Sequence, residues 1–282
     1  MKRTYLLLLM IAVTIVSCKK SDNRESIKEP EEPVIDDPDN PDNGEQPNPE
    51  TATLLQTIVM TSNGATKTYT ITYQGNTAKI DKIAENGGTF TTYVYDGEHI
   101  QKVYWGSENS DDYNAYSYDG SGRLTKDDNF RSSGEDGVTQ LSYSGNKTIV
   151  SGEGVGGMEI ELSYDSGNLT GAVLSDEGTV AGEVAITYDD KNAPFKNVVG
   201  WKEIRYLVGA PLGDNIGFED ILGAGNNPLK LTGTFGGSNV EVNYVYEFSD
   251  SKNPKFPTKL TGTKKVGTNP AETFVAEITY KP

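Results

Sequence analysis

The sequence predicts an all-β protein: a large antiparallel meander of hairpins, curled into a barrel-like or closed sheet. Glycine (31 residues) and tyrosine (16 residues) are frequent in this 282-residue chain, a composition typical of strands and turns. A tyrosine precedes a turn segment at intervals of 21 to 25 residues, at Tyr73, Tyr95, Tyr118, Tyr143, Tyr164 and Tyr188. Two strands and two turns fill such a period, so the repeating unit is a hairpin.

Within the strands, apolar and polar side chains alternate, which indicates antiparallel strands with one apolar and one wet face. In segment 158–164 every second residue is apolar or tyrosine, and Glu159 and Glu161 lie between them. Segments 240–248 and 274–280 repeat this pattern. A meander of about 14 to 16 strands with a single apolar face cannot stay flat, so it must curl or close on itself.

The segment from Asn197 to Pro228 departs from the strand pattern. Val198, Trp201 and Ile204 recur at helical spacing, and a second apolar run ends at a glycine, as helices commonly do. We expect one or two short helices within about 197–223, packing their apolar stripe over an open end or on the concave side of the sheet.

The N-terminal segment predicts targeting rather than folding. Lys2 and Arg3 precede an apolar run that is too short to span a bilayer, as in a secretory signal peptide covering residues 1–17. The ending Ile15-Val16-Ser17-Cys18 resembles the lipobox of bacterial lipoproteins. This resemblance implies that Cys18 is acylated and becomes the mature N-terminus.

Residues 18–53 are acidic and rich in proline, and they predict a disordered tether because they cannot bury enough apolar surface to fold. A single β-hairpin-repeat domain is expected over residues 54–282. The formal net charge of -16 excludes nucleic acid as an expected partner, since phosphate binding needs a basic patch. Cys18 is the one cysteine of the chain, so no intramolecular disulfide can form.

Several stretches resemble known families. Residues 116–125, Tyr-Ser-Tyr-Asp-Gly-Ser-Gly-Arg-Leu-Thr, resemble the tyrosine-aspartate repeat of Rhs-type proteins, which build long β strips. Together with 192–197 and 248–254, they resemble a family of Bacteroidota lipoproteins of unknown function with a porin-like β fold. The resemblance covers most of residues 54–282 and brings no catalytic residues with it. Residues 129–157, glycine-rich and without the Tyr-Asp pair, depart from the pattern.

Candidate catalytic and metal-binding patterns favour structural roles. Residues 152–157 match G-x-G-x-x-G, but an alternating strand follows where a nucleotide site needs a helix, so we expect a hairpin loop. His99, the single histidine, has no nucleophile elbow and no second zinc ligand in the chain, which favours a plain surface residue. Three acid pairs are expected to cap turns, with a weak calcium contact or a glycosidase carboxylate pair as alternatives: Asp111-Asp112, Asp127-Asp128 and Asp189-Asp190. The sequence predicts no catalytic, cofactor-binding or metal-binding residue.

An aromatic cluster between positions 93 and 118 is the best functional candidate. Flat rings stack on sugars, and adjacent hairpins can place several rings in one row. The alternative is that these residues form cross-strand pairs that line the core, with hydroxyls at its wet rim. The cluster also contains Tyr113, and the candidate ligand platform within it consists of Tyr93, Tyr95, Tyr104, Trp105, Tyr116 and Tyr118.

The expected function is that of a non-enzymatic outer-membrane lipoprotein, a binding or scaffold module at the cell surface, with a periplasm-facing position as the alternative. Its expected partners are the membrane, through the lipid anchor, and a glycan or protein. Two other functions stay open: a glycan-binding or carbohydrate-active protein with an aromatic groove, and a carrier of an apolar ligand inside the curled sheet. We expect the apolar strand face to point inward and acids such as Glu159 and Glu241 to face water.

Overall fold

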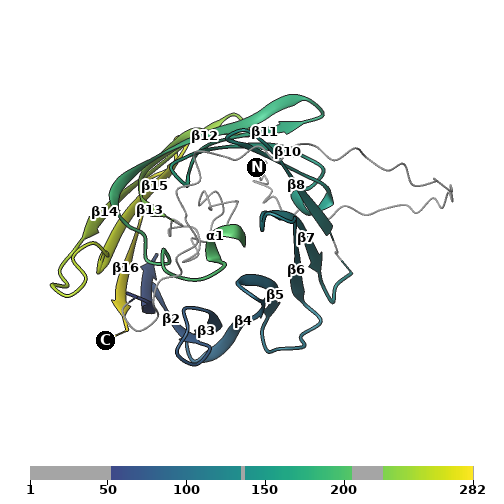
Figure 1. Cartoon of the computed structure of the whole chain (residues 1–282). Coiled ribbons are helices and arrows are strands. Elements are labelled where there is room, and N and C mark those ends of the chain that lie inside the picture. Colours follow the sequence, from purple (N-terminus) through teal and green to yellow (C-terminus); the bar gives the residue numbers. More distant parts are fainter. Residues whose placement is uncertain (1–51, 135–136, 205–224, 282) are drawn as a thin grey trace.

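The computed structural model describes residues 52–134, 137–204 and 225–281. Sixteen strands within these ranges form one closed antiparallel barrel, in which chain neighbours pair and the last strand closes on the first (Figure 1). This confirms the predicted meander and its closure. The predicted signal peptide, Cys18 and nearly all of the predicted tether lie outside the described residues.

The strands are β1 (Leu55–Ser62), β2 (Ala65–Tyr73), β3 (Ile80–Glu85), β4 (Gly88–Asp96), β5 (His99–Trp105), β6 (Tyr113–Tyr118), β7 (Leu124–Phe130), β8 (Gly137–Ser144), β9 (Lys147–Ser151), β10 (Glu159–Asp165), β11 (Asn168–Asp176), β12 (Thr179–Asn192), β13 (Asn226–Phe235), β14 (Ser238–Glu247), β15 (Lys259–Val266) and β16 (Glu272–Tyr280). A short 3-10 helix, η1 (Glu153–Val155), and one α-helical turn, α1 (Trp201–Ile204), complete the described elements. No helix in the described ranges is long and apolar enough to cross a bilayer.

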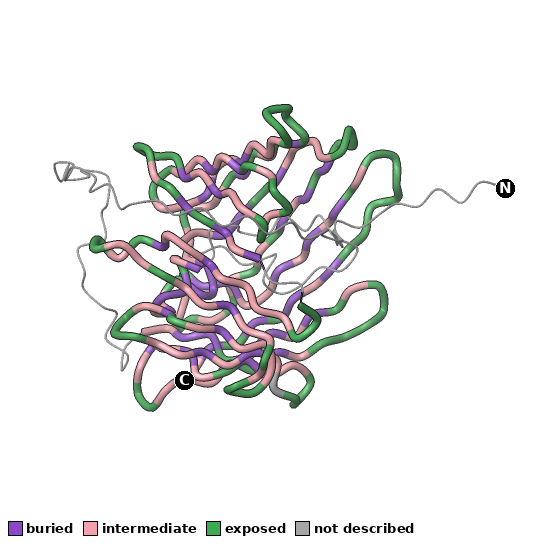
Figure 2. The backbone as a smooth tube through the Cα atoms, turned by 90° about the vertical axis from the view of Figure 1, so that its right-hand side faces the viewer, coloured by how far each residue is buried: buried purple, intermediate pink, exposed green. Residues whose placement is uncertain are grey.

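The apolar face of the strands points into the barrel. Along β2, Tyr69, Ile71 and Tyr73 are buried, whereas the threonines between them are more exposed. Figure 2 shows the same alternation of buried and less buried residues along the other strands, with exposed turns at both ends. The buried residues form one continuous core cluster, which confirms the predicted direction of the apolar face.

The helix α1 lies inside the ring of strands (Figure 1). Trp201 is only 1% exposed and stacks on Phe195 at 3.9 Å between ring centroids. Gly200 brings the chain close to β5, since a Cβ there would lie 2.8 Å from Ile100 Cγ1. The predicted helix on the concave side is therefore confirmed, while the rest of the predicted helical region, 205–223, lies outside the described residues.

The periodic tyrosines hold one end of the barrel together, which we call the clasp end. There the two strands of a hairpin separate, and a buried or half-buried tyrosine hydroxyl on the second strand donates a hydrogen bond to a backbone carbonyl at the start of the first. The bonds are Tyr73 to Leu55 (2.7 Å), Tyr118 to Ile100 (2.8 Å), Tyr143 to Leu124 (2.6 Å), Tyr188 to Leu169 (2.7 Å) and Tyr280 to Pro257 (2.7 Å). Four of the six periodic tyrosines of the sequence thus form backbone clasps, and Tyr95 instead accepts a hydrogen bond from the Ile80 amide at the start of β3.

Candidate functional site

The inner wall of the barrel is polar along β5 to β8, toward the end opposite the clasps. In the strand register, Asn114 lies opposite Val103 on β5 and opposite Asn129 on β7, and Asp127 lies opposite Thr139 on β8. Because residues opposite each other point to the same face and Val103 is buried, these side chains point inward. Trp105 and Arg131 reach the same group through their hydrogen bonds. We call this set the polar arc; it consists of Trp105, Asn114, Asp127, Asn129, Arg131 and Thr139.

A chain of hydrogen bonds fixes the polar arc. Trp105 Nε1 donates to Asn114 Oδ1 over 2.8 Å, and Arg131 Nη2 donates to the same oxygen over 3.3 Å. Asn114 Nδ2 in turn donates to Asp127 Oδ1 over 2.8 Å. The guanidinium of Arg131 also lies over the Trp105 ring, 5.5 Å from its centroid. Both ends of the Asn114 amide are therefore used, which sets its orientation.

Burying the polar arc has a cost in free energy. Asn114 and Asp127 are each only 9% exposed, and a buried carboxylate is tolerated only where donors compensate for its lost hydration. Asn129 Oδ1 is buried without a hydrogen-bond partner among the described residues. Because packing alone would favour apolar residues here, the arc is a candidate site for recognition of a ligand.

The loop between β9 and β10 folds inward against the polar arc. It contains η1, and a Cβ at Gly154 would lie 2.2 Å from Thr139 Oγ1, so only glycine permits this approach. Val155 packs on the core cluster from the same loop. The G-x-G-x-x-G match is thus a hairpin loop followed by β10, as predicted, and its glycines serve close packing.

Three residues of the candidate platform point into the core. Tyr93 is 2% exposed and lies 6.4 Å from Trp201 between ring centroids. Tyr118 uses its hydroxyl as a backbone clasp, and Tyr95 accepts a hydrogen bond from the Ile80 amide and donates to the Val199 carbonyl. The hydroxyls of Tyr95 and Tyr118 thus bind backbone groups at the clasp end, whereas the Tyr93 hydroxyl accepts a hydrogen bond from Thr91 Oγ1.

The other three platform residues separate. Trp105 belongs to the polar arc, and Tyr116 lies opposite Asp127 in the β6–β7 pairing. Tyr104 points outward and forms a column with Tyr113 (5.6 Å), which stacks on Phe130 (4.5 Å). The structure therefore does not bring the six residues into one row, and of these only Trp105 and Tyr116 lie at the polar wall.

His99 differs from the expected plain surface residue. Its ring packs on Tyr118 at 4.5 Å, and its Nδ1 is buried without a hydrogen-bond partner among the described residues. The β5 strand begins at this residue, and the ring lies against the Tyr118 clasp of its own hairpin, β5–β6.

The acid pairs divide between capping and strand positions. Asp112 accepts a hydrogen bond from the Ser132 amide, which lowers the pKa of that carboxyl, and Asp189 caps the Lys191 amide. The expectation of turn capping is wrong for Asp127 and Asp128, since both lie within β7, where Asp127 accepts from Asn114 and Asp128 pairs with Lys126. In the described ranges, no group of three or more His, Cys, Asp or Glu residues is placed to hold a metal ion.

Sequence reasoning missed Asn114, Asn129 and Arg131. One signal was present for Asn114: in the segment Tyr113 to Tyr118, strand alternation puts it on the same face as two tyrosines. No sequence signal separates Arg131 from other surface arginines, because its contact with Trp105 depends on how the turn after β7 folds back.

The protein is thus a closed antiparallel barrel. Side chains around α1 fill part of its interior, and the polar arc lines one part of its inner wall. No protein-family model matches the sequence, and no curated protein matches it. Among solved structures, the chain is similar to a porin-like protein from Bacteroides uniformis, with 12% identity and a TM-score of 0.49, over 80% of this chain and 98% of that one. At this identity the likeness concerns the fold alone.

Proposed function

We propose that this protein is a lipid-anchored, non-enzymatic binding or scaffold module of the outer-membrane surface, whose barrel stands in water. One observation carries the proposal: the polar strand face points outward. Ion pairs between neighbouring strands lie on that face, joining Lys147 to Glu161 (2.6 Å), Lys259 to Glu247 (2.8 Å) and Lys230 to Glu241 (3.3 Å).

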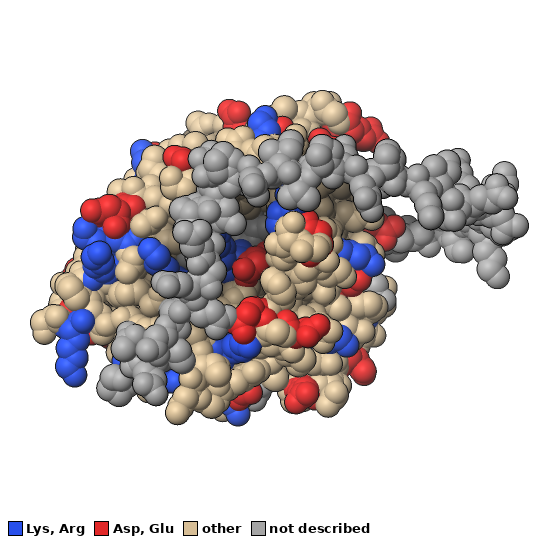
Figure 3. Space-filling view, in the orientation of Figure 1, with Lys and Arg blue, Asp and Glu red and all other residues tan. Residues whose placement is uncertain are grey.

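A barrel embedded in lipid needs the opposite arrangement. Its outer face carries an apolar band about 25 Å tall, and a basic residue there costs ~2–4 kcal/mol at the bilayer midplane. Among the described residues, the exposed large hydrophobic side chains are Val180, Leu229 and Val245, which form no band. Figure 3 shows acidic and basic side chains interspersed over the end of the barrel that is turned to the viewer. The outer strand face, with its ion pairs, is suited to water.

The N-terminal attachment agrees with an anchored domain. Leu54 is 2% exposed, its carbonyl accepts a hydrogen bond from the Lys281 amide, and the Thr53 carbonyl accepts one from Asn197 Nδ2. The chain thus joins the barrel at Thr53, next to the predicted boundary of the tether. An acidic, proline-rich tether behind an acylated Cys18 would hold the barrel clear of the lipid headgroups.

The packing inside the barrel is relevant to the alternative function, a carrier of an apolar ligand. Trp201 and Phe195, each 1% exposed, occupy the space beside β4 and β5 where an apolar ligand would otherwise lie. This occupancy disfavours a carrier, and it favours a module that presents its surface and its polar arc.

The proposal is tested by separating the barrel from its anchor. The mature chain from residue 18, with Cys18→Ser, is expected to be monodisperse and β-rich without detergent, and to leave the detergent phase in which the wild-type lipoprotein partitions. Ser21→Ala in the tether is the matched control and should partition like wild type. A Cys18→Ser chain that stays soluble only in detergent would contradict the proposal.

A further inference from the structure

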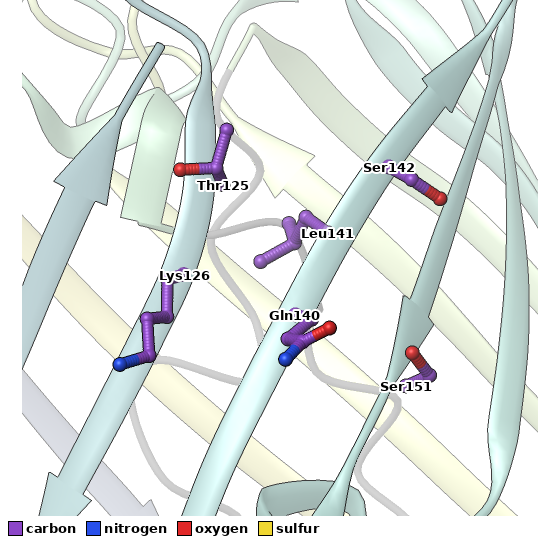
Figure 4. Close-up of a pocket in the computed structure, with 6 residues that line it drawn as sticks. All are labelled: Thr125, Lys126, Gln140, Leu141, Ser142 and Ser151. Carbon is purple, nitrogen blue, oxygen red and sulfur yellow. The ribbon is translucent and has the colours of Figure 1, made fainter. Parts of the chain in front are cut away.

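The seam between β7 and β8 is short. The two strands pair over four positions, from Lys126 opposite Gln140 to Asn129 opposite Gly137. Beyond Lys126 they separate toward the clasp end, where the Tyr143 hydroxyl bridges them by donating to the Leu124 carbonyl. Figure 4 shows the two strands apart at this place.

A depression of about 310 Å³ lies at this seam. Lys126 is opposite Gln140 and Gln140 is opposite Ser151, so these three side chains form one row across three strands. Gln140 is exposed, and the Lys126 side chain is 42% exposed, so the row lies on the outer face. The lining residues are Thr125, Lys126, Gln140, Leu141, Ser142 and Ser151 (Figure 4).

The polar groups of the depression are available for a ligand. Within the described part of the chain, the side chains of Gln140, Ser142 and Ser151 form no hydrogen bond with protein atoms, so only water competes for them. Lys126 is paired with Asp128 at 2.9 Å, which reduces its attraction for an anion. Leu141 is 5% exposed and supplies a small apolar floor.

We infer that this depression is a binding subsite for one neutral sugar residue of a glycan, an inference that rests on the proposed surface binding module and names its ligand. A pyranose ring is ringed by hydroxyls that both donate and accept, and it has small apolar C–H faces. The Gln140 amide, the hydroxyls of Ser142 and Ser151 and one apolar contact match those needs, while the Thr125 hydroxyl already donates to the Ser117 carbonyl. The volume is at the lower end of the ~300–1,000 Å³ of ligand sites, enough for one ring but not for a folded segment.

The lining excludes the other common ligand classes. A nucleobase needs an aromatic or apolar slot, and no aromatic residue lines the depression. A hydrophobic peptide side chain would bury little area against Leu141 alone. A free carboxylate or phosphate would call for an unpaired cation, whereas Lys126 is already paired.

The test uses the mature chain with Cys18→Ser in affinity electrophoresis through gels that contain dextran, galactomannan, mixed-linkage β-glucan or polygalacturonate. At least one neutral polysaccharide should retard the protein, and the double variant Gln140→Ala/Ser142→Ala should lose at least tenfold in apparent affinity. Gln56→Ala, an exposed glutamine on β1, is the matched control and should bind like the parent chain. Melting temperatures of all variants should agree.

Three results would overturn the inference: no retardation by any neutral polysaccharide, retardation that the double variant keeps, or binding of polygalacturonate alone. A failure of the proposed function is distinguishable, because it shows as dependence on detergent before any sugar is added. If the chain is monodisperse in water but binds none of the neutral polysaccharides, only the inference of a glycan subsite is overturned.

Discussion

Two arcs of the same barrel wall differ in the residues that they turn inward. The arc formed by β13–β16 and β1–β4 is mainly apolar, with Ile58, Val242 and Phe274 fully buried, although buried Asn227 and Lys264 interrupt it, Lys264 lying opposite Val242. The polar arc along β5–β8 instead has Asn114 and Asp127 at the corresponding inward positions. Tyrosine clasps occur in both arcs, so the group of hydrogen-bonded buried polar side chains is what distinguishes the polar arc.

The difference coincides with a change in the sequence repeat. Residues 129–157, which depart from the tyrosine-aspartate pattern, supply Asn129, Arg131 and the inward-folded loop with η1. The apolar arc therefore consists of regular hairpins, and residues 129–157 supply much of the polar arc. A stretch that keeps buried polar groups at a cost in stability is where a specific role is expected.

The largest contrast is expected between the two tryptophans: Trp201 lies in the apolar core beside β4 and β5, and Trp105 belongs to the polar arc. Trp201→Ala removes a side chain that is 1% exposed and stacked on Phe195, and should lower the free energy of unfolding by about 3–5 kcal/mol. Trp105→Ala removes a half-buried ring and one hydrogen bond to Asn114, and should cost about 1–2 kcal/mol. Urea unfolding followed by circular dichroism measures both. Equal losses would show that the helix α1 does not anchor the core.

How far the sequence could predict these features depends on the range of the interactions. Alternation within strands and the tyrosine spacing are local signals, and they predicted the strands, their apolar face and the barrel. Trp201 was predicted to lie on the concave side because its helical spacing broke the strand pattern. The hydroxyl contacts of Tyr73 or Tyr143 could not be predicted as clasps, because they depend on how far paired strands separate.

The polar arc was beyond local reasoning for a different reason. Asp127 was predicted to cap a turn because it is one of two adjacent aspartates, but neighbouring strand residues point to opposite faces. One carboxylate of the pair therefore enters the barrel while Asp128 pairs with Lys126 outside at 2.9 Å. Which of the two enters is set by the register of β6 with β7, a property that the sequence of β7 alone does not contain.

That adjacent pair provides the next prediction. Asp127→Ala leaves the buried Asn114 amide without its acceptor and should cost about 1–3 kcal/mol, whereas Asp128→Ala breaks an exposed ion pair and should cost about 0–1 kcal/mol. The double variant Asn114→Leu/Asp127→Leu removes both partners of this bond but also takes the acceptor from Trp105 Nε1 and Arg131 Nη2, so it should not recover the loss. Chemical denaturation at pH 7 measures all three. A loss for Asp127→Ala no larger than that for Asp128→Ala would show that the buried hydrogen bond does not stabilise the arc.

The smallest effect is expected at a clasp. Tyr143→Phe removes one hydrogen bond to the Leu124 carbonyl at the β7–β8 seam and should cost about 1 kcal/mol at pH 8. Tyr104→Phe, on the outer face, forms no hydroxyl hydrogen bond with described residues and should leave the stability unchanged. Hydrogen exchange at the β7–β8 seam should quicken only in the first variant.

The same clasp has a pH dependence of defined sign. Burial raises the pKa of Tyr143 to about 12 from its ordinary value of about 10, so over this window the folded chain keeps a proton that the unfolded chain loses. The unfolded state then binds fewer protons, and the stability that Tyr143 contributes is complete below pH 10 and falls as the pH rises toward 12. Phenylalanine has no proton to lose, so the stability difference between wild type and Tyr143→Phe should shrink between pH 8 and pH 11. A difference that stays constant or grows would mean that the hydroxyl is exposed to water in solution and does not clasp the seam.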